Sequence, residues 1–324
     1  MYRIQRIIIE TIERLELNLE GLTVYTEAAS GHYIYTPIIG ALAGAKVFAF
    51  TKDSVYGYAA VNKQKLVELS KQFDVFNRIE IVFEKKGMQI HQADIVTNSG
   101  LLRPINQQFI ELMKPGSVIA LMYEAWERRE SDIEIDVCRK KGIKVVGVNE
   151  DHSLVDVFRY VGILAVKLLL ESEIEVYKCN IGILSSDKFG KAIGKYLERC
   201  GAQVKKSNSL SELLIDQLDA VIYSSYNRNI KFDSASLRFM RDNGIRIIQF
   251  LGIPAPDYQS IKRFGIDISP DKPVPSNAMS FTFSSLGPKP VIELHAAGLK
   301  AAEIVLNEVD REKTSFQDLV QLIV

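Results

Sequence analysis

Short apolar segments alternate with helical segments along most of this chain, and this alternation constrains the fold more than any other feature. Strand-like runs are expected at 22–29, 46–51, 93–99, 143–150, 180–186 and 218–225. Strands that alternate with helices of ten to fifteen residues form parallel βαβ units with right-handed crossovers. The sequence therefore predicts the α/β class, with two doubly wound, Rossmann-like domains whose parallel sheets face each other across a cleft.

A length of 324 residues accommodates two such domains of about 150 residues each. The interpretation places an N-terminal domain at 1–152, a second domain at 153–310 and a C-terminal tail at 311–324. A long apolar helix at 153–171 opens the second domain and joins it to the first. An apolar helix of this kind, on a protein of zero net charge, favours a homodimer.

Charge, hydropathy and cysteine pattern exclude several classes of protein. Forty basic residues balance forty acidic ones, so the chain lacks the basic surplus that a nucleic-acid partner requires. The N-terminal segment is typical of an amphipathic helix and not of a signal peptide, and the most apolar internal run, at 161–166, is too short to span a membrane. Three scattered cysteines form no CxxC or Cys/His cluster, so no metal site is expected. These features predict a cytoplasmic protein with reduced thiols and a small-molecule ligand.

The loop that follows the strand at 180–184 is where a doubly wound domain would hold a dinucleotide. Such a site needs G-x-G-x-x-G, because only glycine lets the backbone approach the pyrophosphate at the helix N-terminus. Here Ser185 and Asp187 occupy the first two glycine positions, and only Gly190 retains the third. The Asp187 carboxylate is suited to cap the helix instead. The pattern indicates a dinucleotide-type fold with a degenerate phosphate site.

From Ala93 onward the chain resembles the D-isomer-specific 2-hydroxyacid dehydrogenases, two-domain NAD enzymes of the formate and glycerate dehydrogenase type. The resemblance is carried, in order, by SDIEIDVCRKKGIKVVGVNE, NIGILSSDKFGKAIG, GIDISPDKPVP and VIELHAAG, and it covers about two thirds of the chain. It implies NAD as the cofactor, an arginine that holds the substrate carboxylate, and a histidine tuned by a glutamate as the acid/base.

This catalytic set carries over only in part. His295 matches the family histidine and is the candidate catalytic residue, although a structural role in a helix at 290–308 is an equal alternative. The arginine expected before Gly252 is replaced by Leu251, and the glutamate expected before Pro273 by Lys272. Loss of the arginine removes the bidentate hold on a carboxylate, and a lysine would lower the histidine pKa where the glutamate raises it. We therefore expect the family hydride transfer to be lost.

Other candidate residues follow strand ends, where the ligands of α/β sheets bind. The set expected to line the cleft is His32, Asn98, Ser99, Arg103, Glu124 and His152. Caps, turns, solvated ion pairs and a hinge are the structural alternatives for these residues. Asp53 follows the second strand and is a candidate for binding a ribose if a nucleotide lies in the first domain.

Three hypotheses follow. The preferred one is a divergent 2-hydroxyacid dehydrogenase-like protein that binds a small polar or anionic ligand in the interdomain cleft, with no cofactor firmly predicted. The second is an active NAD(P)-dependent oxidoreductase with an atypical cofactor site. The third is a non-catalytic, dimeric assembly or structural protein. A weak match of the EAASG loop to S-adenosylmethionine-dependent methyltransferases is a minor alternative.

Overall fold

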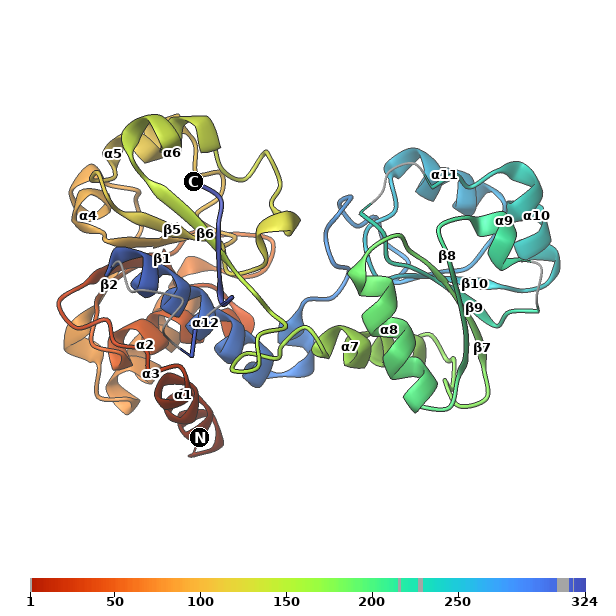
Figure 1. Ribbon diagram of the computed structural model, residues 1–324, viewed down its shortest axis with the longest axis horizontal. Coiled ribbons are helices and arrows are strands. Elements are labelled where there is room, and N and C mark those ends of the chain that lie inside the picture. Colours follow the sequence, from red (N-terminus) through yellow and green to blue (C-terminus); the bar gives the residue numbers. More distant parts are fainter. Residues whose placement is uncertain (1, 215–216, 227–229, 308–314, 317) are drawn as a thin grey trace. The chain divides into compact units, whose positions relative to one another are not determined.

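The computed structural model describes residues 2–214, 217–226, 230–307, 315–316 and 318–324. The chain forms two compact units (Figure 1). Unit 1 consists of Met1–Val157 together with Gly287–Val324, and unit 2 consists of Phe158–Leu286. The prediction of an α/β fold with two sheet-containing domains is confirmed.

The division of the chain differs from the predicted one. The chain leaves unit 1 near the expected boundary but returns to it at Gly287, so the helix at the end of the predicted second domain belongs to unit 1. The segment predicted as a tail also contributes to unit 1, because its residues Val320–Leu322 form a strand that pairs with Lys144–Val148. Unit 1 is therefore built from two separate parts of the sequence.

Unit 1 contains a seven-stranded sheet in the order β12-β6-β5-β4-β1-β2-β3. Its strands are β1 (Thr23–Glu27), β2 (Lys46–Phe50), β3 (Ile79–Val82), β4 (Ile95–Thr97), β5 (Val118–Ala120), β6 (Lys144–Val148) and β12 (Val320–Leu322). All neighbours are parallel except β12, which runs antiparallel to β6. The inner strands are rich in Val, Ile and Ala because helices cover both faces of the sheet.

Helices lie on both faces of this sheet (Figure 1). One layer contains α1 (Tyr2–Arg14), α2 (Tyr35–Leu42), α3 (Ala59–Gln72) and α12 (Pro288–Leu306), and the other contains α4 (Gly87–Gln92), α5 (Gln107–Leu112) and α6 (Ile135–Lys141). Short 3-10 turns occur at η1 (Gly31–Ile34), η2 (Phe76–Arg78) and η3 (Ala125–Glu127). The loop predicted before α2 is thus partly helical.

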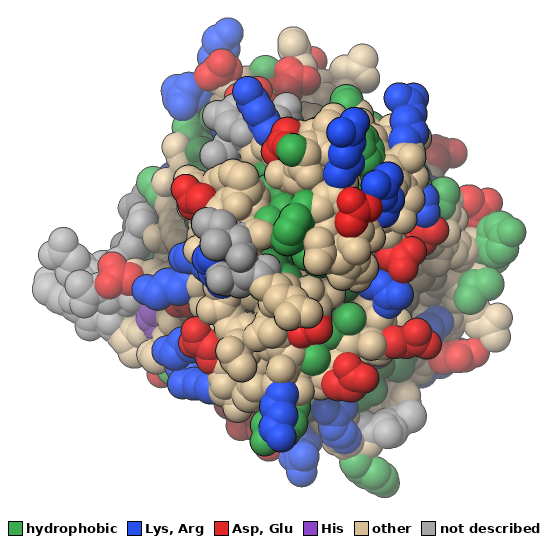
Figure 2. Space-filling model, turned by 90° about the vertical axis from the view of Figure 1, so that its right-hand side faces the viewer, with side chains coloured by type: hydrophobic (Ala, Val, Ile, Leu, Met, Phe, Trp, Pro, Cys, Tyr) green, Lys and Arg blue, Asp and Glu red, His purple; other side chains and the backbone are tan. Residues whose placement is uncertain are grey.

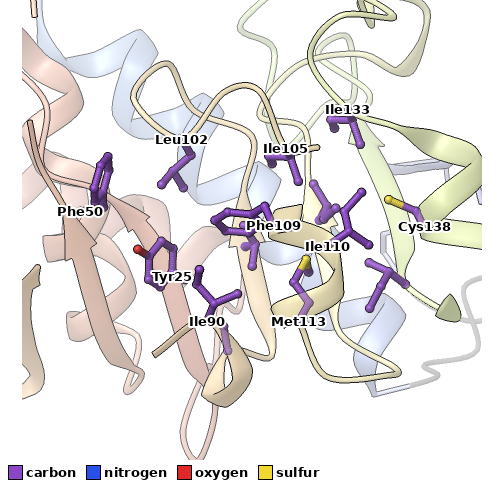
Figure 3. Packing of buried hydrophobic residues seen from close by; sticks show 14 of the residues in the cluster. Tyr25, Phe50, Ile90, Leu102, Ile105, Phe109, Ile110, Met113, Ile133 and Cys138 are labelled. Carbon is purple, nitrogen blue, oxygen red and sulfur yellow. The ribbon is translucent and has the colours of Figure 1, made fainter. Parts of the chain in front are cut away.

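The core beneath α4, α5 and α6 is shown in Figure 3. Tyr25 of β1 packs edge-on against Phe109 of α5, with ring centroids 5.9 Å apart. Ile110, Met113 and Cys138 extend the same apolar cluster toward β5 and β6. Burial of such side chains stabilises each by roughly 1.5–3 kcal/mol, which fixes the strand ends on which the site residues lie.

Helix α12 is the central helix of the other layer and is buried along nearly its whole length. It begins with a proline near its first position, as helices favour, and contacts α1, α2, β5 and β6. A Cβ on Gly298 would lie 2.4 Å from Met122 Sδ, so this glycine allows close packing against the end of β5. The predicted helix at 290–308 is found here, within unit 1.

Unit 2 contains a five-stranded parallel sheet in the order β11-β10-β9-β7-β8. Its strands are β7 (Asn180–Leu184), β8 (Gln203–Ser207), β9 (Ala220–Tyr223), β10 (Arg246–Gln249) and β11 (Ile268–Ser269). Its helices are α7 (Tyr160–Glu171), α8 (Lys188–Arg199), α9 (Leu210–Leu213), α10 (Ser234–Asp242) and α11 (Ala255–Arg263), with a 3-10 turn at η4 (Phe283–Leu286). Helix α8 packs on α7 and on the β7–β8 edge of the sheet.

Helix α7 begins seven residues later than predicted, at Tyr160 instead of position 153. The preceding residues form turns, closed by the backbone bond from Val157 N to Glu150 O at 3.0 Å. Asp156 has a φ of 48°, a left-handed conformation that no α-helix contains. The apolar pattern therefore extends beyond the helix because the turn residues are also partly buried.

The charges on the molecule are mixed. Figure 2 shows basic and acidic side chains interspersed over the face that it presents, without a large region of one sign. No helix among the described residues is long and apolar enough to cross a membrane. In the same part of the chain, no group of three or more His, Cys, Asp or Glu side chains is placed to hold a metal ion.

Candidate ligand-binding site

The strand order of unit 1 places β1 between β2 and β4, so the chain turns in opposite directions on the two sides of β1. Ligands of doubly wound sheets bind at such a switch point, beyond the carboxyl ends of the strands. Three of the predicted residues, Asn98, Ser99 and Arg103, lie in the loop that follows β4. The candidate site is built around this loop.

Arg103 is held in place mainly by Asn98. Its Nε donates to Asn98 Oδ1 at 3.1 Å, and its Nη2 donates to the Asn98 carbonyl oxygen at 2.7 Å. The Asp132 carboxylate lies 3.4 Å from Nε, and the guanidinium stands 5.5 Å from the centre of the Tyr123 ring. The two hydrogen bonds to Asn98 fix the orientation of the guanidinium. A quarter of the Arg103 side chain remains exposed, so solvent still reaches it.

Tyr123 and Asp132 support this arrangement from the loop after β5. The Asn98 amide donates to the Tyr123 hydroxyl at 2.6 Å, and that hydroxyl donates to Asp132 at 3.4 Å. Burial raises the pKa of Tyr123 to about 12, so its hydroxyl keeps its proton at neutral pH. Arg129 also pairs with Asp132, at 3.0 Å. The charged YEAWERRE segment thus contributes ordered ion pairs beside Arg103.

Glu27 ends β1 and is almost fully buried, with only 3% of its surface exposed. Its Oε2 accepts a 2.6 Å hydrogen bond from the Leu101 backbone N–H. Burial raises the Glu27 pKa, while that backbone bond and the positive charge of Arg103 oppose the increase. Since Leu101 lies in the loop that carries Arg103, the Glu27 carboxylate positions that loop.

His295 reaches the same end of the sheet from α12. Its Nδ1 lies 2.6 Å from Thr36 Oγ1 at the start of α2, and its ring centre lies 5.5 Å from that of Tyr33. Burial, and secondarily the positive charge of Arg103, lowers the pKa of His295 to about 4. The imidazole is therefore neutral at pH 7 and interacts electrostatically with the arginine.

Two predicted residues near this cluster have clear structural partners. The Ser99 hydroxyl lies 3.0 Å from Thr97 Oγ1, which in turn pairs with Thr26 of β1. His32 stacks on Tyr35 with ring centroids 6.2 Å apart, and burial lowers its pKa. Ser99 belongs to the loop that holds Arg103, whereas His32 lies in η1, between β1 and α2.

The remaining predicted residues of unit 1 stabilise turns and loops. Asp53 Oδ1 accepts from Ala59 N at 2.8 Å and so caps the start of α3. Glu124 accepts bonds from the backbone N–H of Glu150 and from the indole N–H of the chain's one tryptophan. His152 Nδ1 accepts from Leu154 N at 3.3 Å within the turn before α7. Glu124 is therefore not in the solvated ion pair stated as its structural alternative, because only 2% of its surface is exposed.

In unit 2, a side-chain carboxylate lies at the N-terminus of α8. Asp187 caps this helix, with one carboxylate oxygen accepting from Phe189 N and the other from Tyr226 N, both at 3.0 Å. Ser185 donates to the Ser224 carbonyl oxygen at 2.7 Å. A carboxylate thus occupies the backbone N–H group that a pyrophosphate would use.

Gly190, in the first turn of α8, has the packing role expected of the third glycine. A Cβ at this position would lie 2.4 Å from Ser185 Cβ, so glycine is needed for α8 to pack closely on β7. Leucine and lysine occupy the positions where the family resemblance expects an arginine and a glutamate. Leu251 is fully buried, and Lys272 is exposed with its ammonium 5.8 Å from the Phe281 ring.

The sequence alone did not single out Glu27, Thr36, Tyr33, Tyr123 or Asp132. The only available signal was for Glu27, because a carboxylate at the end of a buried strand is unusual. Thr36 is far from His295 in sequence, and Asp132 is far from Arg103, so no spacing rule connects either pair. Tertiary packing alone brings these side chains together.

No protein-family model matches the chain, and no curated protein matches it in sequence. Solved structures do match it. A dipicolinate synthase structure from Bacillus halodurans is 12% identical with a TM-score of 0.57, and the match covers 89% of this chain and 99% of that one. A dipicolinate synthase structure from Bacillus subtilis is 11% identical with a TM-score of 0.56, and the match covers 90% of this chain and 99% of that one.

An NAD-dependent formate dehydrogenase from Staphylococcus aureus is also among the matches, 13% identical with a TM-score of 0.47 over 94% of this chain and 99% of that one. The likeness to the two dipicolinate synthase structures shows that the chain shares their overall α/β fold.

Proposed function

We propose that this protein binds a small oxyanion, a carboxylate or a phosphate, at the carboxyl ends of β1 and β4 in unit 1. The observation that carries the proposal is the fixed, partly exposed guanidinium of Arg103, oriented by two hydrogen bonds to Asn98. Arginine presents a planar set of N–H donors that matches carboxylate and phosphate oxygens. His295 and Tyr33 flank the position where such a ligand would lie.

The charges around Arg103 support a ligand of low net charge. Asp132 offsets part of the positive charge at 3.4 Å, and Glu27 lies close enough to interact with the arginine. An anion that displaces water from the remaining guanidinium N–H groups gains charge-assisted hydrogen bonds of roughly 1.5–3 kcal/mol each.

We further propose that the hydride transfer of the similar dehydrogenases is absent. The support is the Asp187 carboxylate on the N-terminus of α8 and the replacement of the two expected catalytic residues by Leu251 and Lys272. The ligand-binding role therefore does not depend on a nicotinamide cofactor held at α8.

Calorimetric titration with lactate, pyruvate and inorganic phosphate tests the first proposal. We expect one of these anions to bind, and Arg103→Gln to weaken its binding by at least about tenfold, since a charge-assisted bond is lost. Arg129→Gln is the matched control, because Arg129 pairs with the same Asp132 but makes no bond to Asn98. Equal effects of the two substitutions would show that Arg103 has no specific role.

Titration with NAD, NADH, NADP and NADPH tests the second proposal, that hydride transfer is absent. We expect no micromolar binding by the unmodified protein. Micromolar binding of any of these dinucleotides, retained in Arg103→Gln, would contradict the proposed loss of hydride transfer. It would favour the hypothesis of an active oxidoreductase.

One observation favours the additional proposal of a homodimer. Ile163, Val166 and Leu170 of α7 line an apolar hollow with Lys167 and Glu171, and Leu170 is 55% exposed. Dimerisation through α7 is a prediction, and sedimentation of the intact chain tests it by measuring the oligomeric state.

A further inference from the structure

Two consecutive lysines follow β3, and they have different surroundings. Lys86 is exposed, and its ammonium pairs with Glu84 at 3.4 Å. Lys85 is partly buried, and its Nζ donates to the Leu102 carbonyl oxygen at 2.7 Å. Among the described residues, no carboxylate forms an ion pair with Lys85. This arrangement is unusual, because a lysine that is withdrawn from solvent normally has a partner of opposite charge.

Two aromatic rings flank the Lys85 amine. Its Nζ lies 5.6 Å from the ring centre of Phe50, the last residue of β2, and 5.6 Å from that of Phe109 in α5. Both rings and the Leu102 side chain belong to the apolar cluster shown in Figure 3. The amine therefore borders the hydrophobic core, and three separate parts of the chain determine its place.

A second lysine acts on Lys85 from the neighbouring strand. Lys52 follows β2, and the parallel pairing of β2 with β3 brings the carboxyl ends of these two strands to the same edge of the sheet. Burial lowers the pKa of Lys85, and the positive charge of Lys52 lowers it further. At pH 7 the neutral form is therefore more populated for Lys85 than for an exposed lysine. The neutral amine is the nucleophilic form, and an apolar environment with a neighbouring cation is the setting that activates it.

We propose that Lys85 is a nucleophilic residue that forms an imine with a small aldehyde or ketone, and that Lys52 attracts an acidic group of that ligand. The Lys85 nitrogen adds to the carbonyl carbon, and a C=N bond replaces the C=O bond. The two hydrogens of the neutral amine leave with the carbonyl oxygen as water, so no oxidant or reductant is consumed. This site lies at the ends of β2 and β3 and does not involve Arg103, so it does not depend on the proposed oxyanion binding.

Reductive trapping on the intact protein tests the proposal. Glyoxylate carries an aldehyde beside a carboxylate, and sodium cyanoborohydride converts its imine into a stable secondary amine that peptide mass spectrometry locates. We expect Lys85 to be labelled at neutral pH at least about threefold faster than Lys86, because its amine is more often neutral and Lys52 raises the local concentration of the anion.

Two substitutions separate the parts of the proposal. Lys52→Gln removes the neighbouring charge and leaves the Lys85 amine in place, so we expect glyoxylate labelling of Lys85 to slow by about threefold or more. Lys86→Gln is the matched control, because it makes the same change of charge next to Lys85 in sequence, and it should leave the rate unchanged. Acetaldehyde lacks the carboxylate, so Lys52→Gln should slow its reaction less than that of glyoxylate.

Two results would overturn the proposal. Equal labelling of Lys85 and Lys86 would show that Lys85 is not a preferred nucleophile. Equal effects of Lys52→Gln and Lys86→Gln would show that Lys52 does not assist it. Arg103→Gln should be labelled at Lys85 as fast as the natural chain, so failure of this proposal is distinguishable from failure of oxyanion binding at Arg103.

Discussion

At the scale of single residues, the candidate site is a set of polar groups held by specific partners. Asn98 orients Arg103, Glu27 holds the loop that carries it, and Thr36 holds His295. Sequence reasoning proposed Asn98, Arg103 and His295 because strand ends and a family motif mark them. It assigned Glu124 and His152 to the same site, yet their bonds are to nearby turns and loops. Local sequence does not reveal whether a polar side chain forms hydrogen bonds with its own loop or faces a ligand.

The lowered pKa of His295 predicts a pH-dependent stability. Folding lowers this pKa from its ordinary value of 6.5 to about 4, so between these values the unfolded chain binds the proton more readily. The stabilising contribution is complete above pH 6.5 and is lost as the pH falls toward 4. We expect His295 to cost the folded state about 2 kcal/mol at pH 5 relative to pH 7. Urea unfolding of the natural chain and of His295→Gln at both pH values measures this difference.

The His295→Gln variant serves as the reference because it retains all other titrating groups. Glu27 and Glu303 have raised pKa values and so stabilise the fold more at low pH, in both proteins equally. A natural chain and variant with parallel pH profiles would contradict the buried, neutral state of this histidine.

At the scale of secondary-structure elements, the order of strands and helices followed from the sequence, because hydrophobic period and Gly and Pro punctuation are local signals. The start of α7 was predicted too early, because the buried turn before it continues the apolar pattern. The pairing of β12 with β6 was not predicted, since a three-residue edge strand has no distinct period.

The packing of α7 on α8 gives a prediction at this scale. A Cβ on Gly162 of α7 would lie 2.3 Å from Tyr196 Cβ, a distance that forces the two helices apart. We expect Gly162→Ala to lower the free energy of unfolding by about 1–3 kcal/mol, as overpacking does. Gly194→Ala is the matched control in α8, since its Cβ would meet Ile183 at an ordinary 3.4 Å. That control should be neutral or gain up to about 1 kcal/mol from helix propensity.

Chemical denaturation of the two variants distinguishes them. A Gly162→Ala protein as stable as the natural chain would show that α7 and α8 pack less closely than the structure indicates.

At the scale of the whole molecule, the protein consists of one continuous unit and one discontinuous unit. Two-domain organisation follows from chain length and the repeated strand–helix pattern. The return of the chain to unit 1 could not be predicted, because no local signal states which sheet the apolar helix α12 covers. The similar order of elements in both halves made either assignment consistent with the hydrophobic pattern.

This organisation predicts how fragments behave. The fragment 158–286 contains a complete sheet with its covering helices, so we expect it to fold alone with a cooperative thermal transition. The fragment 1–157 lacks α12 and β12, which cover one face and one edge of its sheet. We expect it to aggregate or to remain without a cooperative transition. Circular dichroism during heating compares the two, and a cooperative transition in 1–157 would contradict the essential role of α12.

The discontinuity of unit 1 also has a consequence for biosynthesis. Domains usually fold in the order in which they leave the ribosome. Here the strands β1 to β6 emerge first, but α12, which covers one face of their sheet, is translated only after all of unit 2. Unit 2 can therefore complete its fold first, while the nascent first segment still exposes the apolar face that α12 will cover. That interval, between translation of β6 and of α12, is when we expect the growing chain to depend most on chaperones.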